Sequence, residues 1–372
     1  MNERVESLAV EEDIRSARTL PPFAFQDRSI AEKEQRAIHQ RGFQLLAPTA
    51  LPTTDKSSTP SDLASTPLVI TRDEDSSLTV LSNICTHAWY PVATEPTQGR
   101  FLTCGQHGRR FDLRGQALTQ MGFDASCNFP CEDDHLPTYP LHQVGPLSFV
   151  GLGQESEADW EAFSKPWLQE LESYPLDELN YAPREGERRA LDGNWKQHAW
   201  NYLDAFHIPF IHRGPEGLVD AIDYKSYTTE IYDHAVLQWA WAKDPAHGLK
   251  PEHTPKRLRH DDKRVFALWY FLWPNLTLNF YPWGLSVNRY GIAPHSPTEC
   301  HFEWYHYVLD ESLYAKADQI WLNDQVDQED VDAMGLVRAN IESGATKRAR
   351  FSPTEELGPH WFHHRVSQAL LA

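Results

Sequence analysis

The chain has 372 residues, which is enough for two ordinary domains or for one large domain that carries a small inserted one. Its composition, 41% hydrophobic and 23% charged, is that of a globular protein, and a formal net charge of -19 argues against nucleic-acid binding, which needs a basic surface. No apolar run approaches the roughly 20 residues that span a bilayer, and the N-terminus does not have the layout of a signal peptide. The five cysteines are too few for a disulfide framework in a chain of this size. We therefore expect a cytoplasmic protein in which cysteine serves as a metal ligand.

The N-terminal part of the chain predicts a helix followed by a small β domain. Residues 1–41 are interpreted as an arm and a helix, in which Ser29 and Glu32 form a capping-box pattern. Residues 47–67 are rich in Pro, Ser and Thr and predict irregular loop. Short β-like runs separated by turn residues follow over 68–150, which predicts a small antiparallel β domain.

The remainder predicts an α+β domain. An acidic stretch with helical character covers 154–179, and 194–207 has helical composition and is expected to end against Pro209. Two later regions are dominated by Tyr, Trp, Phe, Val and Thr, which predicts long strands of an open antiparallel sheet; these regions are 224–243 and 264–308. Residues 311–343 then predict one long helix.

Two cysteines and two histidines in the β-like part are spaced like metal ligands. Cys85 and His87 follow one β-like run, and Cys104 and His107 follow another, with sixteen residues between the two pairs. Structural zinc is one use of four such ligands, but zinc fingers usually place both cysteines in one pair and both histidines in the other. One Cys and one His from each loop match a [2Fe–2S] cluster with two Cys on one iron and two His on the other.

This arrangement resembles the Rieske cluster motif, and the following GRRFDLRG resembles its continuation in Rieske oxygenases. Those enzymes commonly have Arg-Gly directly after the first histidine, where this chain has Ala88-Trp89. Respiratory Rieske proteins carry an extra cysteine in each loop, and its absence here favours a cytoplasmic, ferredoxin-like cluster. Cys127, Cys131 and His135 have the spacing of another site, but without a fourth partner nearby we interpret them as ordinary loop residues.

A second candidate site lies in NWKQHAWNYLDAFHIPFIH, residues 194–212. On an unbroken helix His207 and His212 would point roughly 140° apart, but Pro209 is expected to break the helix and let them converge. Two histidines and a carboxylate form the facial triad of non-haem Fe(II) oxygenases. Two ordinary histidines flanking a proline turn are the alternative, but the stretch resembles the Asp/Glu-x-x-His-x-x-x-x-His iron motif of Rieske oxygenase large subunits.

The third iron ligand is expected on the helix near the C-terminus. Five acids occur there: Asp324, Asp327, Glu329, Asp330 and Asp332. Asp330 lies near the middle of an apolar face that comprises Val326, Ala333, Met334, Val337 and Ile341. A carboxylate on such a face needs a partner, because burying it unpaired is costly. The family pattern also aligns its liganding Asp with Asp330. The resemblance further implies that Asp204 couples the iron to a cluster histidine of the neighbouring subunit, with Asn201 as a supporting residue.

The substrate and the electron donor are less well defined. Candidate aromatic pocket residues are Trp239, Trp241, Trp269, Phe271, Trp273, Tyr281, Trp283, Trp304 and Tyr305, and such walls accept a flat ring or a quaternary ammonium. Nothing resembles a flavin or nicotinamide site, so a separate NAD(P)H-dependent reductase, with or without a ferredoxin, is expected. Residues 100–115 hold Arg100, Arg109, Arg110 and Arg114 against Asp112, a patch that either docks an acidic electron carrier or pairs with acids at a subunit interface.

Together these features predict the terminal component of a Rieske non-haem iron oxygenase. The fold class is α+β: a small antiparallel β Rieske domain (42–150) inserted in a helix-grip-type catalytic domain with an antiparallel sheet and a long C-terminal helix (1–41 and 151–372). The expected cofactors are a [2Fe–2S] cluster and mononuclear Fe(II). The expected reaction uses O₂ to hydroxylate an aromatic ring or to oxidise a methyl group beside N or O. The resemblance to Rieske oxygenases implies a head-to-tail homotrimer. The stretches NYLDAFHIPFIH and QEDVDAMGLVRANIESG look closest to the single-subunit branch that includes choline- and carnitine-type monooxygenases. The alternatives are an electron-transfer protein with a degenerate catalytic domain and a zinc-stabilised binding module.

Overall fold

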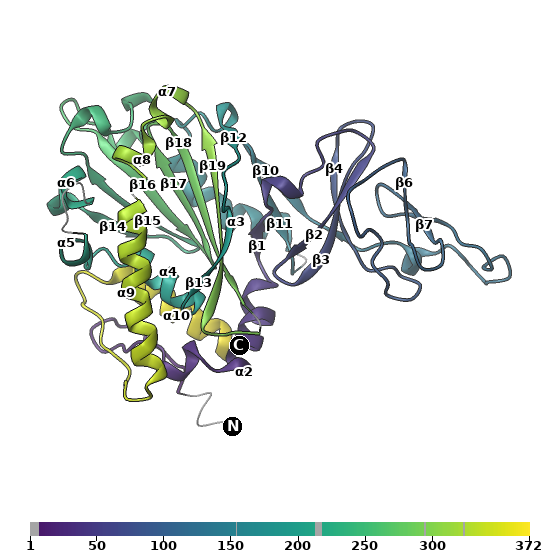
Figure 1. The fold of residues 1–372 in the computed structure, drawn as a ribbon, viewed down its shortest axis with the longest axis horizontal. Coiled ribbons are helices and arrows are strands. Elements are labelled where there is room, and N and C mark those ends of the chain that lie inside the picture. The colour runs from purple at the N-terminus through teal and green to yellow at the C-terminus, as the bar shows by residue number, and fades with distance from the viewer. Residues whose placement is uncertain (1–6, 154, 213–217, 294, 323) are drawn as a thin grey trace. The chain divides into compact units, whose positions relative to one another are not determined.

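The computed structural model describes residues 7–153, 155–212, 218–293, 295–322 and 324–372. The chain divides into two compact units, each described by itself (Figure 1): a larger one, Met1–His39 with Ala158–Ala372, and a smaller one, Gln40–Glu157. The domain boundaries at 42 and 150 stay a prediction. In the described part of the chain no helix combines the length and the apolar character that crossing a membrane requires.

The smaller unit consists of short antiparallel strands in three sheets. The strand orders are β1-β11-β10, β5-β2-β3-β4-β9 and β6-β7-β8. The strands are β1 Phe43–Leu45, β2 Ser57–Leu63, β3 Thr66–Arg72, β4 Leu78–Ser82, β5 Thr97–Gln98, β6 Phe101–Thr103, β7 Arg110–Asp112, β8 Ala117–Thr119, β9 Thr138–Tyr139, β10 Leu141–Val144 and β11 Leu147–Gly151. The prediction of a small antiparallel β domain is therefore confirmed.

The prediction of loop over 47–67 was wrong for its second half. Residues Ser57–Leu63 form β2, which pairs along its whole length with β3. Pro60 sits within β2 opposite Val69, although proline cannot donate to a ladder and is normally confined to sheet edges. Only Ser57 and Ser58 pair with β5 on the other side, so most of β2, including Pro60, is an edge. An edge strand of small polar residues has the composition of a loop, which is why the sequence pattern misled.

The larger unit is built on one antiparallel sheet of eight strands (Figure 1). The order is β12-β19-β18-β17-β16-β15-β14, with β13 also paired to β19. The strands are β12 Asn180–Ala182, β13 Arg188–Asp192, β14 Thr228–Ile231, β15 Ala235–Trp241, β16 Val265–Leu272, β17 Leu276–Tyr281, β18 Gly284–Ile292 and β19 Glu299–Val308. Every residue of β16 and β17 is buried, so the centre of the sheet is covered on both faces.

The helices of the larger unit are α2 Arg28–Glu34, α3 Glu157–Glu170, α4 Trp195–Leu203, α5 Ile208–Ile211, α6 Leu218–Ala221, α7 Glu311–Tyr314, α8 Ala317–Ile320, α9 Asp324–Glu342 and α10 Leu357–Leu371. Two predictions need correction. The long helix expected over 311–343 is divided into α7, α8 and α9. The cap of α2 is Asp27, whose carboxylate accepts from the Ser29 N–H, so the expected capping box at Ser29 is absent.

Helix α4 brings the second candidate site to the sheet. Its N-cap, Asn194, accepts from the Lys196 N–H, and Gln197 reaches back to the Asn194 N–H, which forms a capping box. The buried face of α4 packs against α10 in one core cluster, which contains Trp195, Ala199, Leu203, Phe362, Val366 and Leu370. Contrary to expectation the helix ends at Leu203, and Pro209 lies in the first turn of α5, where a missing N–H costs nothing.

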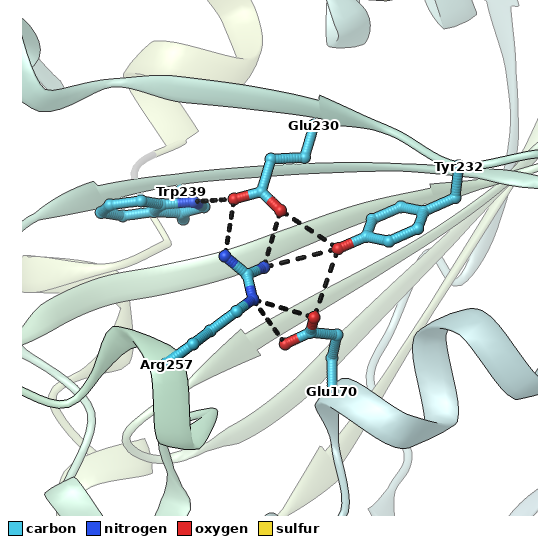
Figure 2. Close-up of polar contacts among 5 residues, drawn as sticks. All are labelled: Glu170, Glu230, Tyr232, Trp239 and Arg257. Carbon is cyan, nitrogen blue, oxygen red and sulfur yellow. Dashed lines mark hydrogen bonds and ion pairs between the residues drawn. The ribbon is translucent and has the colours of Figure 1, made fainter.

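A polar network ties α3 to the far edge of the sheet (Figure 2). Arg257 donates to both carboxylate oxygens of Glu170 and to both of Glu230 on β14, at 2.7–3.0 Å. Tyr232 donates to Glu230 at 3.1 Å, and the Trp239 indole N–H donates to Glu230 at 2.9 Å. One guanidinium therefore joins a helix, an edge strand and the segment between β15 and β16.

Candidate metal centres and substrate cavity

The two Cys-His loops of the smaller unit have matching backbone turns. The N–H of Cys85 donates to the carbonyl of Tyr90, and that of Cys104 donates to the carbonyl of Arg109, both at 2.9 Å. Each cysteine carbonyl then accepts from the N–H four residues on, at 3.0 Å, from Trp89 in one loop and Gly108 in the other. Trp89 has φ +60° and Gly108 has φ +72°, so the missing glycine of the family pattern leaves a tryptophan in the left-handed conformation.

The four candidate cluster ligands associate as a pair of thiols and a pair of imidazoles. Cys85 and Cys104 are buried and free, and burial together with the neighbouring Cys104 thiol raises the pKa of Cys85. The rings of His87 and His107 lie 4.7 Å apart. A thiol pair and an imidazole pair are what a [2Fe–2S] cluster requires, with two Cys on one iron and two His on the other.

Arg109 supports the cluster loops from inside the unit, which corrects the view of it as part of a docking patch. Its side chain is only 2% exposed, pairs with Asp134 at 3.1 Å and donates to the Thr86 hydroxyl at 2.9 Å. It also donates to Gln120, whose amide contacts Nδ1 of His87 at 2.7 Å. Arg109 is therefore a buried structural residue that supports His87 through Gln120.

The other arginines of that region are exposed. Arg114 pairs with Asp73 at 2.9 Å, and Arg100 and Arg110 also lie at the surface. Of the extra Cys and His residues, Cys127 and Cys131 are exposed and free, and His135 Nδ1 accepts from the Ala117 N–H. Their interpretation as ordinary loop residues fits these contacts.

In the larger unit three predicted iron ligands converge. His207 and His212 flank α5, the first as its N-cap and the second as its C-cap, and Asp330 lies on α9. The two Nε2 atoms are 3.2 Å apart, and Asp330 Oδ1 lies 3.4 Å from the first and 3.2 Å from the second. Three donor atoms in a nearly equal-sided triangle form one face of a coordination octahedron, as in a facial triad.

The electrostatics of this triangle suit a cation. Although buried, Asp330 Oδ1 has no hydrogen-bond partner in the described part of the chain. Burial opposes ionisation of Asp330, but contacts to His207 and His212 outweigh it and lower its pKa well below the usual range. Burial likewise opposes protonation of His207, but Asp204 and Asp330 raise its pKa to about 9. A ferrous ion would fit this donor set, because it would accept the three converging lone pairs and its charge would offset that of the carboxylate.

Surrounding side chains orient the ligands. Asp204 caps the end of α4: its Oδ1 accepts from the Phe206 N–H at 2.8 Å and its Oδ2 lies 3.4 Å from His207 Nδ1. Glu329, one residue before Asp330, contacts His212 Nδ1 at 2.9 Å. Its interaction was not foreseen, because the helical phase that selected Asp330 turned Glu329 away from the apolar face. Asn201 lines the cavity beside the triad.

A cavity of about 300 Å³ adjoins the triad. Its predicted aromatic walls are Trp269, Tyr281 and Trp304, and the aromatic residues that were not foreseen are Tyr202, Tyr227, Phe266, Tyr290, Phe302 and Trp321. The remaining candidates, Trp239, Trp241, Phe271, Trp273, Trp283 and Tyr305, lie elsewhere. Strand alternation explains part of this, because Phe302, Trp304 and His306 occupy alternate positions of β19 and line the cavity together.

Comparisons with known proteins agree with this architecture. The family model described as "Ring hydroxylating alpha subunit (catalytic domain)" matches residues 176–372, and "Rieske [2Fe-2S] domain" matches residues 44–140. Choline monooxygenase from Amaranthus tricolor is 24% identical over 95% of this chain and 78% of its own length. The carnitine monooxygenase oxygenase subunit of Escherichia coli K12 is 21% identical over 72% and 69%, respectively. A solved quaternary ammonium Rieske monooxygenase superposes with a TM-score of 0.75 at 18% identity, over 98% of this chain and 97% of its own.

The catalytic-domain model covers more than half of the chain, and the predicted fold class is confirmed by the Rieske oxygenase structure. The chain carries a Rieske [2Fe–2S] domain and a catalytic domain that binds mononuclear iron. It belongs to the ring-hydroxylating α-subunit family and is the terminal oxygenase component of a Rieske non-haem iron system.

Proposed function

We propose that this oxygenase oxidises a methyl group of a methylated ammonium compound, with His207, His212 and Asp330 as the ligands of its mononuclear iron. The observation that carries the proposal is the convergence of these three donor atoms beside an aromatic cavity. Iron held there supplies the activation of O₂. In the net reaction one oxygen atom enters a C–H bond and the other leaves as water, and two electrons and two protons are consumed.

The remaining site residues receive roles in electron delivery. Cys85, His87, Cys104 and His107 hold the [2Fe–2S] cluster in this proposal, two on each iron. Asp204 couples the two metal centres through its contact with His207, and Asn201, one turn earlier on α4, is a supporting residue in the cavity wall. The Nδ1 atom of His207 is thereby oriented by a carboxylate, as is usual for metal-bound imidazoles.

The aromatic residues of the cavity wall support a cationic substrate. Tyr227 stacks on Trp269 with ring centroids 5.8 Å apart, and the Trp269 N–H donates to the Tyr281 hydroxyl at 3.1 Å. Such walls attract a quaternary ammonium by cation–π interaction. The names of the choline, carnitine and quaternary ammonium monooxygenases support the same substrate class. Hydroxylation of an aromatic ring, which the family description suggests, is the competing outcome.

Partners and assembly complete the proposal. An NAD(P)H-dependent reductase, with or without a ferredoxin, supplies the electrons, because the sequence shows no nicotinamide or flavin site. A head-to-tail homotrimer brings each cluster near the next subunit's iron, and the solved quaternary ammonium enzyme is described as transferring electrons between subunits. We place the protein in the cytoplasm, on the sequence features that favoured it.

The test combines composition and turnover. Protein purified without oxygen should contain about three irons and two acid-labile sulfides per chain. With a reductase, NADH and O₂ consumption should rise when a trimethylammonium compound is added, and an aldehyde should be released. About two irons and two sulfides, unchanged by added Fe(II), would support an electron carrier instead. Consumption that responds only to aromatic compounds would overturn the substrate class.

A further inference from the structure

Helix α9, Asp324–Glu342, carries the proposed iron ligand Asp330 and is attached to the larger unit unevenly along its length (Figure 1). Every side chain over 326–340 is at least partly exposed, and the first buried one is that of Ile341, at 8%. A helix that packs firmly on a core buries an apolar residue at nearly every turn. Most of α9 therefore lies on the larger unit without being packed into it.

The C-terminal half of α9 is held by contacts of the protein itself. Ile341 and Val337 pack in the core cluster that also contains residues of α4 and α10. The Arg338 guanidinium donates to the Asp192 carboxylate at 2.8 Å. These contacts need no metal, so they hold this half of the helix in the iron-loaded and the iron-free protein alike.

The N-terminal half of α9 faces the cavity. The side chains that line it are Val326, Asp327, Asp330 and Val331. Of these, Val331 also packs against the core cluster. The polar ties of this half all lead to the proposed iron site: Asp330 Oδ1 lies 3.4 Å from His207 Nε2 and 3.2 Å from His212 Nε2. Glu329 Oε2 lies 2.9 Å from His212 Nδ1. The attachment of this half therefore depends largely on the iron ligands.

The sequence of α9 weakens the helix at the junction of the two halves. Residues 326–337 contain four acids and no Lys or Arg, and like charges three residues apart, as in Asp327 and Asp330, destabilise a helix. Gly335 lies at the junction, and only proline is less favourable in a helix interior. A Cβ added to Gly335 would meet no atom within 4 Å, so no close approach requires a glycine there. Conformational freedom is the property that Gly335 supplies.

We propose that residues 324–334 of α9 are a lid that hinges at Gly335, and that binding of the mononuclear iron closes this lid over the cavity. The inference rests on the proposed iron ligands and adds a conformational step to them. An ion held by Asp330 and the two histidines would join the lid to α5. Once detached, the lid is shorter than the ~12–15 residues that an isolated helix needs to persist in water. Opening therefore breaks backbone hydrogen bonds.

An opening lid also gives iron a route to its ligands. The side chain of His212 is only 2% exposed, because Glu329 and Asp330 lie against both of its ring nitrogens. Both acids belong to α9, so displacing the lid uncovers the imidazole. The same motion controls the loss of iron, since the ion leaves when the lid opens.

Hydrogen–deuterium exchange measured by mass spectrometry tests the lid directly. The full chain with its cluster intact is compared without mononuclear metal, with Fe(II) under anaerobic conditions, and with Zn(II) as a redox-inert ion for the same donors. Without metal, the amides of residues 328–334 are expected to exchange about tenfold faster than those of residues 339–342, after correction for intrinsic rates. Either ion should slow exchange over 328–334 by about tenfold or more and leave 339–342 unchanged.

Two matched variants locate the hinge. Gly335→Ala strengthens the helix at the junction without a clash, so it should slow exchange over 328–334 about fivefold in the metal-free protein. It should also slow the release of Fe(II) to a chelator several-fold. Ala339→Gly places a glycine at an exposed position of the C-terminal half. This control should leave both exchange over 328–334 and iron release unchanged.

The outcomes separate this inference from the proposed function. If metal analysis shows bound iron but exchange over 328–334 does not change, the lid is overturned while the iron site stands. If neither ion binds, the proposed ligands fail and the lid fails with them. Equal protection of both halves in the metal-free protein would also overturn the lid. Unchanged exchange in Gly335→Ala, or altered exchange over 328–334 in Ala339→Gly, would show that Gly335 is not the hinge.

Discussion

Glu329 Oε2 lies 2.9 Å from Nδ1 of His212, on the ring edge opposite the Nε2 atom that faces Asp330 Oδ1 at 3.2 Å. Two consecutive residues of α9 therefore hold the two nitrogens of one imidazole. A carboxylate at Nδ1 fixes the tautomer that leaves an Nε2 lone pair for a metal and makes that nitrogen more basic. Glu329 is thus a positioning residue for the proposed iron ligand His212.

Replacing Glu329 should weaken iron binding without affecting the cluster. Glu329→Ala is expected to lower Fe(II) affinity by about tenfold to a hundredfold, the usual cost of losing a carboxylate behind a metal-bound histidine. Glu329→Gln keeps an acceptor oxygen and should lose less. Fe(II) affinity is measured by competition with a chelator, and the visible absorbance of the cluster serves as the internal control. Unchanged iron affinity in Glu329→Ala would show that the contact does not orient His212.

Trp89 should be replaceable by glycine with a gain in stability. Its φ of +60° costs a non-glycine residue about 1 kcal/mol, and at 83% exposure its ring contributes little packing. Trp89→Gly should therefore raise the free energy of unfolding of the smaller unit by about 1 kcal/mol. Gly108→Ala is the matched variant in the other loop, where φ is +72° and an added Cβ meets no atom within 4 Å. It should lower the same free energy by a similar amount, as read from urea unfolding at the cluster absorbance.

The ligand candidates could be predicted from the sequence because metal chemistry limits both residue type and spacing. Cys85-x-His87 and Cys104-x-x-His107 each lie within one turn, so the local chain alone brings each pair together. Asp330 is far away in sequence, yet helical phase against an apolar face selected it from five acids. In each case the decisive geometry is local, and sequence patterns report local geometry well.

Features that depend on distant partners were predicted poorly. The end of α4 at Leu203 is an exception, because it was missed although its cause is local: the Asp204 carboxylate accepts from the Phe206 N–H and competes with continuation of the helix. Arg109 was predicted to be a surface charge because its ion-pair partner, Asp134, lies twenty-five residues away and no local sequence pattern indicates the pairing. The strand β2 could not be predicted from its own residues, because its extended conformation depends on pairing with β3. Burial and pairing of this kind are properties of the assembled unit.

Arg257 should be important for stability, although it lies outside the active site. Its guanidinium side chain is 39% exposed and pairs with Glu170 and Glu230, whose side chains are 19% and 26% exposed (Figure 2). Arg257→Met leaves two partly buried carboxylates facing each other and should lower the free energy of unfolding by about 2 kcal/mol, less than for a fully buried pair. Lys256→Met removes the adjacent but exposed pair with Glu172 and should change stability by less than about 0.5 kcal/mol. Equal effects of the two variants in urea unfolding would contradict this ranking.

Buried histidines should make the larger unit sensitive to acid. Burial lowers the pKa of His39, His306 and His363 to about 3, whereas the unfolded chain protonates histidine near pH 6.5. Between these values the unfolded chain binds more protons than the folded one, so stability falls as the pH is lowered from about 6.5 towards 3. Each of these three histidines contributes a slope of about 1.4 kcal/mol per pH unit in that window, and above pH 7 their contribution to the slope should vanish.

His363 offers the variant that isolates one of these contributions. Its Nδ1 accepts from the Leu20 N–H at 3.0 Å, so a neutral ring carries its proton on Nε2, which has no partner among the described residues. In His363→Asn the amide oxygen can replace Nδ1 as acceptor and no group titrates. The variant should lose packing at pH 7.5 but show a stability slope between pH 6 and 4.5 that is shallower by about 1.4 kcal/mol per pH unit. Urea unfolding at several pH values measures both slopes, and parallel slopes would mean that His363 is not held neutral by burial.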